Sequence, residues 1–477
     1  MVVNKRIKAV ALRFGSVFVL VFMCLMLFSC STQQKEDKSV FANKVQPYMG
    51  SWQSTIDTGP GKTAPVILHF KRENDGVSAT LDSPNQNVFD IPLIAITGDV
   101  ENMLLVNEQL ALTLELKLFQ QKLGGELKVR QHKFAVEFTS YDSVNESNTR
   151  VKPPQTPEPP FSYEIEELIA YSQTHSIAAT LTMPKGEGVF PAVILISGSG
   201  PDNRNYAKFG HQRFWVMADH LTKNGIAVLR YDERGVGQST GNFDSVDFSG
   251  LADDVELLIT ELKKHKKIDT NKIGLIGHSE GTMIGSIVAA TNQNVGFLAL
   301  LGGMFDPNVG LSMQYKNIAT ELNLDEQTFV DVIKSLERQA LASASAEQLK
   351  QYYFDNHAEK LPLPEQLLSY TSEHFTSPVM RSFLSYSPED YLAKLTIPVI
   401  GMCGELDQYF DCELHSHKAK VIFAQNPKTN LVTKQYAKLN HYFQTAVTGK
   451  IAEEPSLTES ISPEVLSDLS QWIHNQE

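Results

Sequence analysis

The sequence is poor in cysteine and in positive charge, and each scarcity excludes a class of protein. Only four of its 477 residues are cysteines, too few for the disulfide framework of a small secreted domain. Lysine and arginine number 42 against 55 aspartates and glutamates, and the resulting net charge of −13 argues against nucleic acid as a partner. The apolar run at residues 14–28 has about 15 residues, whereas a transmembrane helix needs roughly 20.

The first 29 residues have the pattern of a secretory leader. Four basic side chains within residues 5–13 precede the apolar run, which ends in Leu27-Phe28-Ser29-Cys30. This ending resembles the lipobox of bacterial lipoproteins, in which the cysteine becomes the lipidated N-terminus of the mature chain. We therefore expect a signal peptide over residues 1–29, a palmitate-bearing Cys30 and a polar tether over residues 30–44. An uncleaved anchor helix is the alternative.

Either alternative places the folded part of the chain outside the cytoplasm, in the bacterial cell envelope. Because Ser31 rather than an aspartate follows the cysteine, we expect a lipid anchor in the outer membrane, with the protein facing the periplasm. Two cysteines remain beyond the leader, Cys403 and Cys412. The compartment permits a disulfide between them, but Cys403 also fits a buried strand, and the sequence leaves both possibilities open.

Residues 45–145 show short apolar runs separated by turn residues. The runs at residues 112–118 and 134–138 alternate apolar and polar side chains, which is the pattern of antiparallel strands buried on one face. We predict a small all-β domain here, either a sandwich or a partial barrel. A linker at residues 146–160 follows it, with five prolines in its last ten residues, a composition typical of a stiff, extended spacer.

From residue 161 to residue 477 the pattern changes to continuous apolar runs that alternate with helix-like segments. Such runs are typical of parallel strands covered on both faces. Two paired strands followed by six that alternate with helices is the strand count of the α/β-hydrolase fold, so we predict an α/β domain with an eight-stranded, mostly parallel sheet. The eight runs lie at residues 163–171, 177–183, 192–196, 226–231, 273–276, 295–301, 397–402 and 431–436.

One long interval breaks this alternation. Residues 305–392, between the sixth and seventh strands, are rich in helix formers. In this fold an insertion at that place usually covers the active site, so we predict a helical lid. A helical outcrop remote from the site is the alternative.

Two Gly-x-Ser-x-Gly motifs compete for the nucleophile, one around Ser239 and one around Ser279. A nucleophile elbow requires a buried strand directly before the serine and a helix directly after it. Residues 272–277 supply such a strand and residues 280–290 supply a small-residue helix, whereas Ser239 lies in a turn-rich loop. We therefore predict Ser279 as the catalytic nucleophile.

A serine hydroxyl needs a general base and an orienting carboxylate. In this fold the chain order is serine, acid, histidine, and the ends of the last two predicted strands supply one group each. Asp407 lies in the turn after residues 397–402, and His441 lies in the loop after the final strand. The competing side chains are Glu405 and Asp411 for the acid, and His415, His417 and His474 for the base.

The oxyanion of an acyl-transfer intermediate needs two backbone amides. We expect one from Glu280 and the other from Ser199, in the glycine-rich loop at residues 197–201. Gly198 and Gly200 would also suit a dinucleotide loop, but a third glycine and a following helix are missing. No cofactor and no metal ligand set is expected.

These segments together resemble bacterial α/β-hydrolases of the EstD-like esterase group, often labelled serine aminopeptidase-like or dienelactone hydrolase-like. The resemblance covers nearly all of the mature chain and implies a carboxylesterase for small acyl esters, with Ser279, Asp407 and His441 as the matching catalytic positions. Two alternatives stay open, a peptidase for short peptides and a non-catalytic envelope binding protein. The resemblance is carried by Ile196-Ser-Gly-Ser-Gly-Pro201, Leu229-Arg-Tyr-Asp-Glu-Arg-Gly-Val-Gly-Gln-Ser-Thr-Gly241, Ile276-Gly-His-Ser-Glu-Gly281 and Leu439-Asn-His-Tyr-Phe-Gln444.

Overall fold

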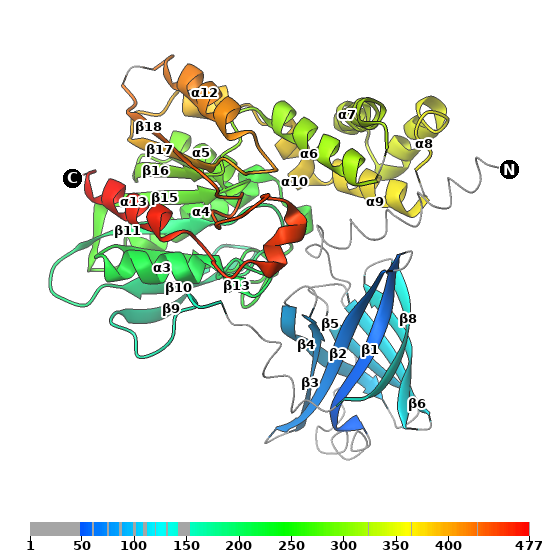
Figure 1. The fold of residues 1–477 in the computed structure, drawn as a ribbon. Coiled ribbons are helices and arrows are strands. Elements are labelled where there is room, and N and C mark those ends of the chain that lie inside the picture. Colours follow the sequence, from blue (N-terminus) through cyan, green and yellow to red (C-terminus); the bar gives the residue numbers. More distant parts are fainter. Residues whose placement is uncertain are drawn as a thin grey trace. The chain divides into compact units, whose positions relative to one another are not determined.

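The chain forms two compact units, the second of which begins at Pro153 (Figure 1). The computed structural model describes residues 48–141, apart from short stretches at 60–61, 74–75, 85–87, 99–101, 108–111, 120 and 130–131, and residues 153–476, apart from 323, 364 and 427. The predicted signal peptide, Cys30 and the tether lie outside the described residues. Within these described ranges, no helix combines the length and the apolar character needed to cross a membrane.

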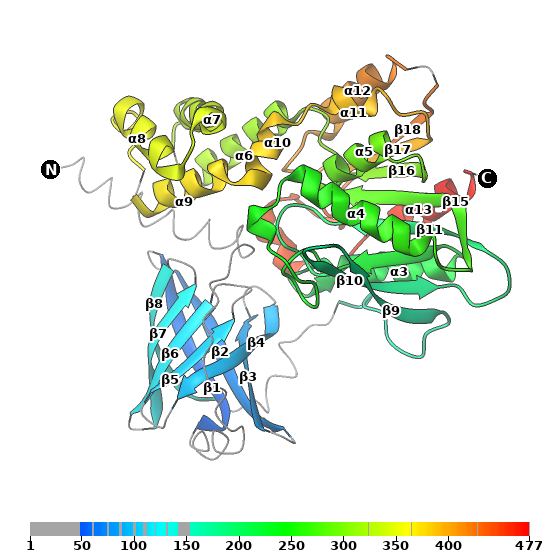
Figure 2. The ribbon, with the colours of Figure 1, turned by 180° about the vertical axis from the view of Figure 1, so that it is seen from behind.

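The first unit is a closed barrel of eight antiparallel strands, each paired with its neighbours along the chain (Figure 2). The predicted all-β domain is thus confirmed, and closure distinguishes it from a sandwich because β1 pairs with β8 as well as with β2. Closure leaves no edge strand open to another chain. The strands are β1 (Gly50–Gly59), β2 (Lys62–Glu73), β3 (Gly76–Ser83), β4 (Val88–Gly98), β5 (Met103–Asn107), β6 (Leu112–Phe119), β7 (Lys122–Val129) and β8 (His132–Tyr141).

The barrel is filled by alternate side chains, as the period-two pattern predicts. In β6, Leu112, Leu114 and Leu116 are buried, whereas the side chains between them face outward. Because successive side chains of a strand point to opposite faces, every second residue meets the core. Trp52, Leu68 and Phe138 belong to the same core cluster, so apolar side chains occupy the interior.

The second unit is built on the predicted eight-stranded sheet, in the order β18-β17-β16-β15-β11-β14-β10-β9. β10 runs antiparallel to both of its neighbours, and the other adjacent pairs are parallel. This is the strand order of the α/β-hydrolase fold, which confirms the predicted fold class. The strands are β9 (Glu164–Tyr171), β10 (Ser176–Met183), β11 (Phe190–Ile196), β14 (Ala227–Tyr231), β15 (Ile268–His278), β16 (Val295–Leu301), β17 (Val399–Gly404) and β18 (Leu431–Tyr436).

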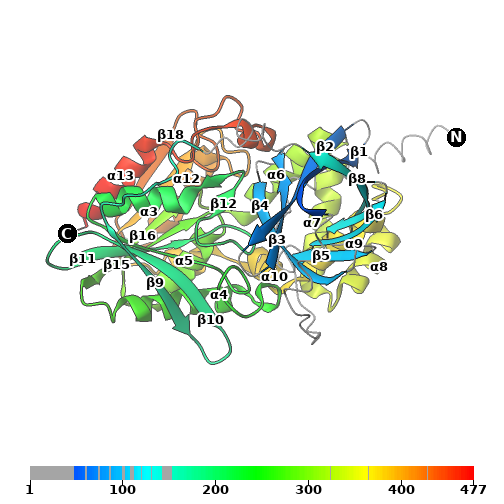
Figure 3. The ribbon, with the colours of Figure 1, turned by 90° about the horizontal axis from the view of Figure 1, so that it is seen from below.

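Helices cover both faces of this sheet, which explains why its central strands are apolar throughout. α3 (Arg213–Lys223) and α13 (Pro463–His474) lie on one face, and α4 (Phe248–Leu262) lies on the other (Figure 3). The remaining elements outside the insertion are α5 (Gly281–Thr291), α12 (Cys412–Phe423), β12 (Ala207–Lys208), β13 (His211–Gln212) and the 3₁₀ turns η4 (Phe243–Ser245) and η5 (Ile451–Ser456).

Between β16 and β17 the chain forms the predicted helical insertion. Its helices begin at polar caps, because the side chains of Asp325, Ser345 and Ser377 each accept a hydrogen bond from an amide of the following turn. Their apolar faces pack on one another, with Leu336 and Leu349 fully buried. The helices are α6 (Pro307–Leu322), α7 (Glu326–Ala342), α8 (Ala346–Asn356), α9 (Glu365–Thr376), α10 (Pro378–Ser385) and α11 (Pro388–Leu392). Its role as a lid stays a prediction.

Candidate active site

Ser279 lies at a sharp turn between β15 and α5. Its φ of 54° falls in the left-handed region, which costs a non-glycine residue free energy and is typical of functional turns. The amide of Ser279 donates to the Leu301 carbonyl at 2.9 Å, which fixes the turn at the end of the sheet. This is the strand–turn–helix geometry of a nucleophile elbow.

The glycines that flank Ser279 are required by close backbone contacts. A Cβ atom on Gly277 would lie 2.3 Å from the Gly281 carbonyl oxygen, and one on Gly281 would lie 2.3 Å from the Ile196 carbonyl oxygen. Any larger residue would push α5 away from β15 or β11. The motif therefore specifies how closely helix and strands pack beneath the serine.

The structure brings both predicted oxyanion donors to this turn. A Cβ atom on Gly198 would lie 3.1 Å from the Ser279 Cβ, so the loop after β11 passes directly beside the nucleophile. Glu280 is the cap residue of α5, and its carboxylate accepts a 2.9 Å hydrogen bond from the Ser199 hydroxyl. The N-terminus of α5 also directs its backbone dipoles toward this region.

Asp407 and His441 form a buried, charge-assisted contact. The distance from His441 Nδ1 to Asp407 Oδ2 is 2.7 Å, and the two side chains are only 4% and 1% exposed. The other carboxylate oxygen of Asp407 accepts the amides of Tyr409 and Phe410, at 2.8 and 3.0 Å. Since Nδ1 donates to the carboxylate, the lone pair of the neutral ring lies on Nε2, as a general base requires.

Two contacts place His441 beside the elbow. His278, which directly precedes Ser279, donates from Nε2 to the His441 carbonyl at 2.9 Å, and the two rings are 4.8 Å apart. Gly302 follows Leu301, the acceptor of the Ser279 amide, and a Cβ atom there would lie 3.1 Å from His441 Cε1. Three loops therefore bring Ser279, His441 and Asp407 to one end of the sheet.

The competing acids and histidines are either exposed to solvent or hydrogen-bonded to other parts of the fold. Glu405 and His417 are exposed, and Asp411 caps α12 through the Leu414 amide. His415 accepts the Phe305 amide on Nδ1, and His474 bonds to the Asn224 carbonyl.

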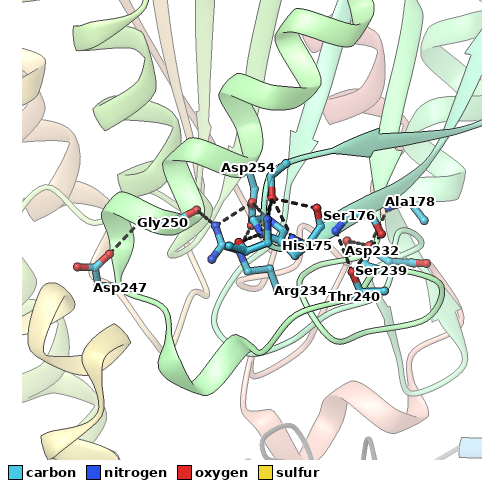
Figure 4. Close-up of polar contacts among 12 residues, drawn as sticks. His175, Ser176, Ala178, Asp232, Arg234, Ser239, Thr240, Asp247, Gly250 and Asp254 are labelled. Atoms are coloured by element: carbon cyan, nitrogen blue, oxygen red, sulfur yellow. Dashed lines mark hydrogen bonds and ion pairs between the residues drawn. The ribbon is translucent and has the colours of Figure 1, made fainter.

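Ser239, the serine of the other Gly-x-Ser-x-Gly motif, holds its loop against the sheet (Figure 4). Its buried hydroxyl donates to the Asp232 carbonyl at 2.6 Å and accepts the Ala178 amide at 2.8 Å. Both partners are backbone groups, so the hydroxyl fastens a loop to β10. No helix follows Ser239 directly, since the next residues lead to η4.

A second Ser–His–Asp contact lies on the barrel. His69 is 2.8 Å from the Ser51 hydroxyl and 3.0 Å from the Asp82 carboxylate. The three residues belong to adjacent strands, and Ser51 pairs with His69 within the ladder. Ser51 lies near the start of β1 and is followed by the strand, so this contact is without the helix N-terminal amides that an acyl-transfer site uses.

Two features near the site were not decided by the sequence, since it left the cysteine pairing open and did not single out Glu233. Cys403 and Cys412 form a disulfide that closes the turn carrying Asp407. Glu233 is buried, and its carboxyl oxygens accept the Ser197 hydroxyl at 2.9 Å and the Asp202 amide at 2.8 Å. Burial, together with Asp202 and Glu280, raises the pKa of Glu233 well above its usual value. The sequence signal for Glu233 was its position directly after an apolar strand.

Among the described residues, no cluster of three or more His, Cys, Asp or Glu side chains could hold a metal.

Comparisons with known proteins give sequence matches over parts of the chain. Residues 209–372 match a protein family described as serine aminopeptidase, S33. The chain is 23% identical to Esterase EstD of Thermotoga maritima over 321 residues, which are 66% of this chain and 68% of the relative. It is 25% identical to Acyl-coenzyme A thioesterase 3 of Mus musculus over 141 residues, 30% of this chain and 29% of the relative.

Solved structures that are similar to this chain include an esterase of Pyrococcus furiosus. It is 15% identical, with a TM-score of 0.41, and the match covers 66% of this chain and 92% of that one. A hyperthermophilic esterase of Pyrobaculum calidifontis is also 15% identical, at a TM-score of 0.40, with 65% and 85% covered. The strand order and the elbow show that the chain has the α/β-hydrolase fold, and its sequence is similar to Esterase EstD.

Proposed function

We propose that the protein is a carboxylesterase that hydrolyses small acyl esters with a Ser279–His441–Asp407 triad. The observation that carries the proposal is the buried His441–Asp407 contact of 2.7 Å, held at the same end of the sheet as the Ser279 elbow. The name of one relative, Esterase EstD, supports the substrate class.

The proposed reaction has two acyl-transfer steps. His441 Nε2 accepts the hydroxyl proton while Ser279 Oγ bonds to the ester carbonyl carbon. The intermediate collapses as its bond to the alkoxy oxygen breaks, and the alcohol leaves with the proton from His441. Water then attacks the acylated serine and gives a proton to His441, which returns it to Ser279 Oγ as the carboxylic acid departs.

The oxyanion of both intermediates would accept hydrogen bonds from the amides of Glu280 and Ser199. A donor of this kind contributes typically about 10²–10³ in kcat, because it is already oriented before the charge develops. The Asp407 carboxylate would stabilise the imidazolium of His441 during each step and keep the ring in the orientation that faces Ser279.

Replacement of Ser279 by alanine tests the proposal. Ser279→Ala should remove hydrolysis of a short p-nitrophenyl ester and covalent labelling by a fluorophosphonate, while the circular dichroism spectrum stays that of the wild type. Ser239→Ala is the matched control, since it removes the serine of the other motif and should still be labelled. Undiminished hydrolysis by Ser279→Ala would show that another group is the nucleophile. A folded wild type that neither hydrolyses nor labels would favour the binding-protein alternative.

A peptidase is the second candidate function, because the family matched by residues 209–372 is described as serine aminopeptidase. The same triad can attack an amide, and the substrate is selected by the walls of the pocket rather than by the triad. Comparison of kcat/KM for short acyl esters with that for aminoacyl p-nitroanilides separates the two. Faster cleavage of the anilides would favour the peptidase.

We further propose that the hydrolase is attached to the outer membrane through lipid on Cys30. The support is the leader pattern, which ends in Leu27-Phe28-Ser29-Cys30, and the polar stretch that follows it. Loss of the Cys30 thiol should therefore release the protein from the membrane.

A further inference from the structure

The loop at residues 197–202 carries Gly198 and Ser199 past the nucleophile, and both of its ends are held by one side chain. Glu233 accepts the Ser197 hydroxyl with one carboxyl oxygen and the Asp202 amide with the other, at 2.9 and 2.8 Å. The amide of Glu233 in turn donates to the Asp202 carbonyl at 3.1 Å. The Glu233 side chain therefore sets the distance between the two ends of the loop.

Asp232 holds the chain just beyond this loop. Its carboxylate accepts the Arg204 amide at 2.8 Å and the Arg204 guanidinium at 2.7 Å. It also accepts the Gln238 amide at 3.0 Å, and a Cβ atom on Gly237 would come within 2.2 Å of it. The loop at residues 232–241 thus wraps closely around a carboxylate that faces the 197–204 segment.

The 232–241 loop is itself fastened to two elements of the fold (Figure 4). Ser239 ties it to β10 through the Ala178 amide and the Asp232 carbonyl. Arg234 ties it to α4, because its guanidinium bonds to Asp254 and to the Gly250 carbonyl. His175 bonds to the same carboxylate at 2.6 Å. The loop is therefore a rigid support with few ways to shift.

We propose that Glu233 is a positioning residue for the oxyanion site, and that the 232–241 loop with its Gly-x-Ser-x-Gly motif is the support that holds Glu233 in place. The proposal rests on the proposed hydrolase function, because the 197–202 loop would supply the Ser199 amide. Glu233 acts through Ser197 and Asp202 and does not itself contact the reacting atoms.

The surroundings of Glu233 fit this role. The group lies near Asp202 and Glu280, and a third negative charge there would oppose the developing oxyanion. Burial, followed by the charge of Asp202, raises the pKa of the Glu233 carboxyl well above its usual value. Its two carboxyl oxygens accept the Ser197 hydroxyl and the Asp202 amide. A glutamine side chain has the same shape; its oxygen can accept the Asp202 amide, and its NH2 group can donate to the Ser197 hydroxyl oxygen.

The test compares Glu233→Gln with Glu233→Ala in the hydrolysis of a p-nitrophenyl ester. We expect Glu233→Gln to keep kcat within about threefold of the wild type, because both hydrogen bonds can form. Glu233→Ala should lower kcat by about 10–100-fold with little change in KM, since a small displacement of an oxyanion donor weakens transition-state binding selectively. A trifluoromethyl ketone, whose serine adduct carries an oxyanion, should bind more weakly to Glu233→Ala by a similar factor.

Asp468→Ala is the control for loss of a carboxylate remote from the site. Asp468 bonds to the Tyr436 hydroxyl and to Lys434, so its loss should affect stability while kcat stays unchanged. A folded Glu233→Ala with wild-type kcat and wild-type ketone affinity would overturn the proposal, as would a Glu233→Gln as slow as the alanine variant. Should Glu233→Ala not fold, Ser197→Ala removes one of the two bonds, and an unchanged kcat would then overturn it.

Failure of the proposed function gives a different result. In that case the wild type shows no Ser279-dependent hydrolysis or fluorophosphonate labelling, whatever stands at position 233. If the wild type is active and labelled and the Glu233 variants match it, only the positioning role of Glu233 is wrong.

Discussion

Reduction of the disulfide between Cys403 and Cys412 should destabilise the hydrolase unit by a predictable amount. The bridge joins β17 to the first residue of α12, with a sequence separation of 9, and Asp407 lies inside the loop that it closes. A crosslink stabilises a protein mainly by restricting the unfolded chain. For a loop of about ten residues, the chain-entropy relation gives about 2.7 kcal/mol at 25 °C.

This free energy converts to a measurable shift in melting temperature. A unit of roughly 320 residues has an unfolding entropy of about 0.7 kcal/mol/K, so the loss of about 2.7 kcal/mol corresponds to a decrease of about 4 °C. The assay is differential scanning calorimetry of the wild type with and without dithiothreitol. The control is Cys403→Ala/Cys412→Ala, which should melt lower than the oxidised wild type and show no further change in dithiothreitol.

Two results would refute this reasoning. One is a wild-type melting temperature that dithiothreitol leaves unchanged although mass measurement shows that the bridge has been reduced. The other is alkylation of both cysteines in denatured protein that was never exposed to a reductant, which would mean that the thiols are free.

Two further predictions concern His211 and Cys30. His211 is fully buried between Ser460 and the Leu457 carbonyl, and burial lowers its pKa from 6.5 to about 4. Because the folded-state value lies below the unfolded one, about 3 kcal/mol of stability is present above pH 6.5 and lost as the pH falls to about 4. His211→Gln should flatten the fall of unfolding free energy between these pH values, measured with urea, and an unchanged slope contradicts the assignment. Cys30→Ser should move the protein from the membrane fraction to the soluble fraction of lysed cells, and continued membrane attachment would favour the uncleaved anchor helix.

Local patterns predicted the fold class and the elbow. The strand, the Gly-x-Ser-x-Gly turn and the helix around Ser279 are contiguous in sequence, and the glycines there avoid contacts of 2.3 Å with neighbouring backbone. The chain order of nucleophile, acid and base follows from the same fold, so Asp407 and His441 could be chosen by their places after the last two parallel strands. The alternating leucines of β6 likewise indicated a one-sided strand.

Contacts between distant segments could not be predicted in the same way. Whether the barrel closes depends on the pairing of β1 with β8, and these strands stand at opposite ends of the domain sequence. The cysteine pair was ambiguous because a buried strand cysteine and a bridged one have the same local pattern. Only the positions of β17 and α12 bring the two sulfur atoms together.

The two Gly-x-Ser-x-Gly motifs illustrate this difference between local patterns and contacts of distant segments. Local sequence was enough to show that Ser279, and not Ser239, has the strand and helix of a nucleophile elbow, because both requirements concern neighbouring residues. The hydrogen-bond partners of Ser239 and Glu233 became visible in the folded protein alone, because Ala178 and Ser197 lie 61 and 36 residues away. Hydrogen bonds across such separations depend on how the strands are ordered in the sheet, which no local pattern encodes.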